Sequence, residues 1–196
     1  MSVLVFADNS EGKFKKTAFE VTSYGKKVAE LAQTNLVVLT INANDASELG
    51  LYGAEKTLNI NDEKLKTFNA KAYADAIKQA AQKEDASIVI VDSSTNGLYL
   101  APLLAVNLEA GYASNVMALP LSVDPFKVKR KSFSSKAYNI SEITTAIKLI
   151  GLSKNSFGLF ENSVDSNNED FSVSLNDDDF NIKSVSVEKM TGKVTI

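Results

Sequence analysis

The chain has 196 residues, 44% of them hydrophobic, with 21 basic and 24 acidic side chains and a net charge of −3, which is typical of a globular protein with its own core. It has no cysteine and no histidine, which excludes thiolate nucleophiles, disulfides, Cys/His zinc sites and a Ser-His-Asp triad. No apolar run approaches the ~20 residues that cross a bilayer, and the charge gives no general affinity for polyanions. We therefore expect a soluble, cytoplasmic protein that inserts into no membrane and binds no nucleic acid.

The first 120 residues alternate short apolar runs with amphipathic stretches. The apolar runs predict buried strands at 3–7, 36–41, 57–60 and 87–91. Helical periodicity predicts helices over 14–32, 46–52, 68–80 and 100–109, with Pro102 in the first turn of the last one. This alternation predicts an α/β fold built on a doubly wound, mostly parallel sheet of the Rossmann-like or adenine-nucleotide-hydrolase-like type.

After Pro120 the pattern changes from alternating helices and strands to strands alone. Runs at 129–133, 136–140 and 144–150 predict an antiparallel β extension of the sheet. The stretch 155–182 has seven acidic residues and no lysine or arginine, which is typical of a solvated or partly disordered loop. Alternation over 183–196 predicts a terminal β-hairpin, so we expect one domain over 1–196.

Polar side chains follow the first and fourth predicted strands, where a doubly wound sheet binds its ligands. Asp8 comes after the first strand, and Ser93, Ser94 and Asn96 belong to the run of hydroxyls and amides after the fourth. Such a run before a helix can hold an anion with backbone N–H groups. The same residue types are also favoured in N-caps and turns, which is the simpler explanation.

Three other motifs are explained better by structure than by chemistry. Gly50-Leu-Tyr-Gly53 matches the first half of a pattern in ATP-binding universal stress proteins, but its later Gly-Ser/Thr partner is absent, so it indicates a helix end. Asp177-Asp-Asp179 lacks the ligand spacing of a calcium loop, so we expect no metal site. Lys127-Val-Lys-Arg-Lys131 indicates a solvated hairpin or a surface that faces a protein partner.

Several segments together resemble the N-terminal domain of the alpha subunit of electron-transfer flavoprotein. They are Ser2-Val-Leu-Val-Phe-Ala-Asp8, Tyr52-Gly-Ala-Glu-Lys56, Ser93-Ser-Thr-Asn-Gly97 with Leu100-Ala-Pro-Leu-Leu-Ala105, and the final stretch from Val185 to Ile196. The chain departs from the family pattern at Leu98 and Leu103, where basic residues are common, and at Ser135-Lys136-Ala137, which replaces Gly-Asn-Ala.

The resemblance implies that this is a structural, subunit-contact domain without catalytic residues. It implies a heterodimer with a beta subunit, in which FAD is held mainly by a C-terminal domain with a Val-Val-Ser-x-Gly-Arg-Gly segment, and that segment does not occur in this chain. The complete protein would carry electrons from dehydrogenases, such as the acyl-CoA dehydrogenases of fatty acid beta-oxidation, to a quinone reductase or a similar acceptor. The alternative is a stand-alone adenine-nucleotide-binding module of the universal-stress-protein type. A hydrolase that uses Asp8 or Asp92 with a lysine has no supporting spacing.

Overall fold

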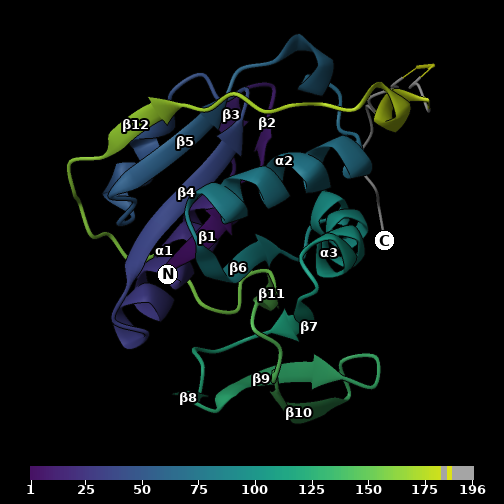
Figure 1. The fold of residues 1–196 in the computed structure, drawn as a ribbon. Helices are drawn as coiled ribbons and strands as arrows, with labels where there is room; N and C mark the ends of the chain where they lie inside the picture. Colours follow the sequence, from purple (N-terminus) through teal and green to yellow (C-terminus); the bar gives the residue numbers. More distant parts are fainter. Residues whose placement is uncertain (182–184, 187–196) are drawn as a thin grey trace, which may run out of the picture.

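A computed structural model describes residues 1–181 and 185–186, and the hairpin expected over 183–196 lies outside the described residues apart from Val185 and Ser186. One large, mostly parallel sheet runs through the described part of the chain (Figure 1). Its strands lie in the order β10 (Ala137–Glu142), β9 (Phe126–Ser132), β7 (Gly111–Val116), β11 (Lys148–Leu152), β6 (Ala86–Asp92), β1 (Ser2–Phe6), β4 (Asn35–Ile41), β5 (Lys56–Ile60) and β12 (Asn167–Asp170).

Three α-helices cover the two faces of this sheet. Helix α1 (Lys16–Leu31) packs on one face, and α2 (Ala70–Lys83) and α3 (Thr95–Asn107) lie side by side on the other (Figure 1). The remaining elements are short: β2 (Asn9–Ser10), β3 (Lys13–Phe14), β8 (Ser122–Val123), and 3₁₀ helices at Ala46–Leu51, Glu63–Leu65 and Asp177–Phe180.

Strand β1 shows why the sheet is covered on both faces. All five of its residues are buried. Val3 and Val5 pack in the core beneath α1, whereas Leu4 and Phe6 pack in the core beneath α2 and α3, as the period of two in a strand requires. β1 pairs in parallel with β4 on one side and β6 on the other, which confirms the predicted doubly wound α/β fold.

The antiparallel extension is smaller than the sequence predicts. β9 and β10 pair antiparallel, as expected, but the third predicted strand is β11, which lies inside the sheet and pairs in parallel with both β6 and β7. Leu149 and Ile150 of β11 are buried on opposite faces of the sheet. The strand is therefore covered on both faces, whereas a strand of a solvated antiparallel extension would have one face exposed to solvent. The sequence analysis missed β7, whose residues are mostly half-buried.

Helix α3 begins earlier than predicted, at Thr95 rather than near Leu100. Ser94 is its N-cap, because the Ser94 hydroxyl accepts a hydrogen bond from the Gly97 N–H at 3.1 Å. Pro102 therefore lies inside the helix and not in its first turn.

The acidic stretch 155–182 is not only the solvated loop that its composition indicates. It contains β12, which pairs in parallel with β5, and the 3₁₀ helix Asp177–Phe180. The segment packs on the α2 face through four partly buried apolar residues: Phe171, Val173, Leu175 and Phe180. The alternation of apolar and polar residues between Phe171 and Leu175 thus predicts the packing of this segment better than its acidic composition does.

The acidic stretch is held on α2 by hydrogen bonds between the Gln79 side chain and the Ser174 backbone, and it also brings the carboxyl of Asp179 close to that of Asp75 on α2. Asp179 is only 6% exposed; its Oδ1 lies 3.3 Å from Lys71 Nζ, and its Oδ2 is buried without a hydrogen-bond partner. Burial raises the pKa of the neighbouring Asp75 carboxyl, and the nearby carboxylate of Asp179 raises that pKa further, against the charges of Lys78 and Lys71. The folded state therefore favours the protonated form of Asp75.

We expect the Asp75→Asn variant to unfold with a weaker pH dependence than the wild type. Because the Asp75 pKa is raised on folding, the folded state holds this proton more tightly, and stability falls as pH rises above the ordinary aspartate range. A neutral amide at this position removes the repulsion between the two carboxylates, and should add about 1 kcal/mol at neutral pH. Urea unfolding at acidic and neutral pH measures this effect. The exposed Asp178→Asn is the matched control, and equal pH slopes in the wild type and Asp75→Asn would contradict the raised pKa of Asp75.

Candidate functional site

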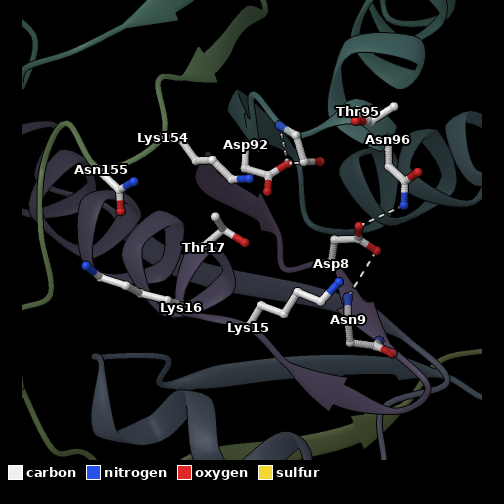
Figure 2. A pocket seen from close by; sticks show the side chains of 11 residues that line it. Asp8, Asn9, Lys15, Lys16, Thr17, Asp92, Thr95, Asn96, Lys154 and Asn155 are labelled. Atoms are coloured by element: carbon white, nitrogen blue, oxygen red, sulfur yellow. Dashed lines mark hydrogen bonds between the residues drawn. The ribbon is translucent and has the colours of Figure 1, made fainter. Parts of the chain in front are cut away.

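The carboxyl ends of β1 and β6 meet at the point where the strand order reverses. From β1 the chain continues to β4 and β5 on one side of the sheet, and then returns to β6 on the other side. A cleft of about 450 Å³ lies at this edge (Figure 2). Of the four residues predicted for the site, Asp8, Ser94 and Asn96 line this cleft, and Ser93 does not.

Asp8 is held at the end of β1 by two hydrogen bonds. The Asn96 side-chain amide donates to Asp8 Oδ2 at 2.9 Å, and the Asn9 N–H donates to Asp8 Oδ1 at 3.0 Å (Figure 2). Burial raises the pKa of the Asp8 carboxyl; the Asn96 hydrogen bond opposes this, and the nearby charge of Asp92 adds to it. Asp8 thus links β1 to α3 through Asn96.

Asp92 and Ser94 form the turn that begins α3. The Ser94 hydroxyl donates to Asp92 Oδ1 at 2.7 Å, and the Ser94 N–H donates to the same oxygen at 3.2 Å. The Ser93 N–H instead donates to the Leu152 carbonyl at 2.9 Å, and the Ser93 hydroxyl is buried without a hydrogen-bond partner. The capping explanation given in the sequence analysis accounts for the contacts of Ser94.

The cleft is also lined by three lysines, which the sequence analysis did not identify as site residues. Lys15 and Lys16 come from the start of α1, and Lys154 comes from the segment after β11 (Figure 2). The N-cap of α1 is Lys15, and no side chain caps that helix end. The sequence offered one signal for Lys15 and Lys16, which is that they form an adjacent pair before an amphipathic helix. It offered none for Lys154, which reaches the cleft only because β11 inserts in parallel beside β6.

The cleft combines two carboxylates, three ammonium groups and several amides and hydroxyls. These groups can recognise a small polar ligand. In the part of the chain that the structure describes, no group of three or more acidic side chains could hold a metal ion. None of the helices among those residues has the length and apolar character needed to span a membrane.

The other sequence motifs lie away from the cleft. Gly50 belongs to the 3₁₀ helix Ala46–Leu51, and Gly53, with a φ of 93°, follows its end, as expected. The basic run from Lys127 to Lys131 lies on β9, and Asp177 to Asp179 belong to the last 3₁₀ helix.

Comparisons with known proteins agree on one family. Residues 3–173 match the family described as the electron transfer flavoprotein domain. The electron transfer flavoprotein subunit alpha of Bacillus subtilis is 28% identical over 137 residues, which are 69% of this chain and 42% of that protein. The acryloyl-CoA reductase electron transfer subunit beta of Anaerotignum propionicum is 28% identical over 127 residues, 63% of this chain and 35% of that protein. Protein FixB of Clostridium saccharobutylicum is 26% identical over 124 residues, 62% of this chain and 37% of that protein.

The chain spans less than half the length of these curated relatives. The family match runs from β1 past β12, so it covers the parallel sheet, its three helices and the antiparallel hairpin. This chain belongs to the electron transfer flavoprotein domain family.

Proposed function

We propose that this chain is the structural, subunit-contact domain of an electron-transfer flavoprotein alpha subunit, and that the complete protein is an electron carrier rather than an enzyme. The match over residues 3–173 is the observation that carries this proposal. In such a protein a flavin supplies the redox chemistry, and this domain needs no general acid or base of its own.

FAD does not fit the cleft at the ends of β1 and β6. Its eleven lining residues are all polar or charged, with no aromatic or aliphatic side chain against which the flavin ring system could pack (Figure 2). We therefore propose that FAD is held mainly by a C-terminal domain of the full-length protein. The role of the present residues is to form a rigid base, because the sheet is covered on both faces.

The partner in this proposal is a beta-type subunit. Several large apolar side chains of α3 are exposed, namely Leu98, Tyr99 and Val106. Exposed apolar side chains grouped on one element are typical of a surface that is covered in a complex. We further propose dehydrogenases, including the acyl-CoA dehydrogenases of fatty acid beta-oxidation, as electron donors, a quinone reductase as acceptor, and the cytoplasm as the location. Relatives named as electron transfer subunits support the electron-carrier role.

We expect the 196-residue chain to purify without colour, and the full-length alpha chain to form a yellow 1:1 complex with a co-expressed beta-type subunit. Light scattering after size exclusion gives the stoichiometry, and absorbance gives the flavin content. A 196-residue chain with stoichiometric flavin would contradict the proposed place of FAD. Failure of the two full-length chains to associate would contradict the subunit-contact role.

The second candidate function is adenine-nucleotide binding in the cleft. The observation that favours it is the position of the cleft at the strand-order reversal, beside the uncapped start of α1 and three lysines. Calorimetric titration with ATP and AMP tests it. Binding that is lost in Lys15→Ala would support this function, and no heat at millimolar nucleotide would exclude it.

A further inference from the structure

The cleft at the carboxyl ends of β1 and β6 is polar on every side. Its volume of about 450 Å³ falls within the ~300–1,000 Å³ that is usual for small-molecule sites in proteins. Most such sites are lined by apolar and aromatic side chains, whereas this one is lined by charged groups, amides and hydroxyls. An aromatic base would find no apolar wall here, so a ligand that fits the cleft must be polar throughout.

Three lysines make part of this cleft positively charged. Lys15 and Lys154 extend toward its middle from two separate segments, and Lys16 also lines it (Figure 2). None of the three forms an ion pair with a described residue. They lie at the start of α1, where no side chain caps the helix and the first turn has no acidic residue. Because a helix start also has N–H groups without partners in the helix, this part of the cleft attracts a phosphate group.

A buried carboxylate at the end of β6 points to a different group of the ligand. Asp92 is 8% exposed and lines the cleft. Its Oδ1 accepts both hydrogen bonds from Ser94, whereas its Oδ2 has no hydrogen-bond partner among the described residues and faces the cleft (Figure 2). A buried carboxylate oxygen without a donor costs free energy, so Oδ2 favours a ligand that donates a hydrogen bond to it. A hydroxyl group is such a donor.

We propose that the cleft binds a phosphorylated sugar, with the phosphate at the start of α1 against Lys15 and Lys154 and a sugar hydroxyl donating to Asp92 Oδ2. This inference rests on the second candidate function, because it names the part of a nucleotide that the cleft recognises: the ribose phosphate, with the base outside. A free sugar phosphate offers the same groups. A metal ion is a poorer occupant, because the cleft is lined by two carboxylates against three ammonium groups. Inorganic phosphate is also poorer, because it offers Asp92 no sugar hydroxyl.

Calorimetric titration of the 196-residue chain with ribose 5-phosphate, AMP, adenosine and inorganic phosphate tests this proposal. We expect ribose 5-phosphate to bind at least about tenfold more tightly than adenosine, which lacks the phosphate, or inorganic phosphate, which lacks the sugar. AMP that binds about as tightly as ribose 5-phosphate would identify the ribose phosphate of a nucleotide, and AMP that binds about tenfold more weakly would identify a free sugar phosphate; either result supports the proposal. AMP that binds about tenfold more tightly than ribose 5-phosphate would show that the base is recognised, which overturns this inference and leaves the second candidate function standing.

A double variant tests the phosphate contact. Lys15→Ala with Lys154→Ala should weaken ribose 5-phosphate binding by about tenfold or more at low salt, with a smaller difference at high salt. The matched control is Lys66→Ala with Lys136→Ala, which changes the net charge equally at exposed positions outside the cleft and should change the affinity by less than about twofold. Equal losses in the double variant and its control would overturn the proposal.

Asp92→Asn tests the sugar contact separately. The variant keeps the oxygen that accepts from Ser94 but presents an amide N–H₂ to the cleft, so the preference for ribose 5-phosphate over inorganic phosphate should fall by about tenfold. Unfolding midpoints in urea show whether each variant folds as stably as the wild type. Equal affinities of the wild type for ribose 5-phosphate and inorganic phosphate would overturn this inference. No heat with any of the four compounds at millimolar concentration would overturn both this inference and the second candidate function.

Discussion

Replacing Glu20 by alanine is expected to lower the free energy of unfolding by about 4 kcal/mol. Glu20 lies on α1 and is 2% exposed. Its carboxylate accepts three backbone hydrogen bonds from the segment after β11: from Asn155 at 2.9 Å, from Phe157 at 2.9 Å and from Gly158 at 3.0 Å. These hydrogen bonds are partly buried, and each hydrogen bond to a charged group contributes about 1.5–3 kcal/mol, so loss of the common acceptor is costly.

Two further variants separate this effect from a general loss of charge. Glu20→Gln keeps one acceptor oxygen but presents an amide N–H₂ to at least one backbone donor, so we expect a loss between zero and that of Glu20→Ala. Glu30→Ala removes an exposed carboxylate from the same helix, paired with Lys27, and should cost less than about 0.5 kcal/mol. Urea denaturation gives all three values. A Glu20→Ala loss as small as that of Glu30→Ala would contradict the anchoring role.

The Glu20 anchor also supports one wall of the cleft. Asn155, whose N–H donates to Glu20, lines the cleft together with Lys154. Nearby, Phe157 packs edge-on against Tyr24 of α1, with ring centroids 5.2 Å apart. The same variant should therefore speed amide exchange around residues 154–158 before it affects the sheet.

The features that the sequence predicts well are those fixed by local patterns. The apolar run at β1, the amphipathic spacing of α2 and the capping residues around Ser94 each depend on neighbours within a few residues. The rules for crossover connections then predict that the carboxyl ends of the parallel strands lie at one edge of the sheet. Asp8 and Asn96 were therefore expected at that edge, and they are hydrogen-bonded to each other there.

The features that the sequence does not predict depend on contacts between distant segments. Glu20 interrupts an apolar helix face, and its partners lie more than a hundred residues later in the chain, so only the tertiary structure explains a buried carboxylate. Lys154 reaches the cleft because β11 inserts in parallel between β6 and β7, whereas its short apolar run is equally compatible with an antiparallel extension.

Replacing Gly97 by alanine is expected to lower the free energy of unfolding by about 3 kcal/mol. Gly97 lies in the first turn of α3, close against the end of β6. A Cβ atom there would lie 2.0 Å from the Asp92 carbonyl oxygen and 2.9 Å from Asp92 Oδ1. The closer atom belongs to the backbone, so the helix or the strand end must move.

The sign of this effect separates close packing from helix propensity. In an open helix, alanine in place of glycine stabilises by about 1 kcal/mol, so a loss in Gly97→Ala can come only from the contact with Asp92. Val106→Ala, at an exposed position of the same helix, is the matched control and should change stability by less than about 0.5 kcal/mol. Urea unfolding measures both variants, and a Gly97→Ala protein as stable as the wild type would contradict the close approach. Because a shifted α3 also carries Asn96 away from Asp8, faster amide exchange at the start of α3 should accompany the loss.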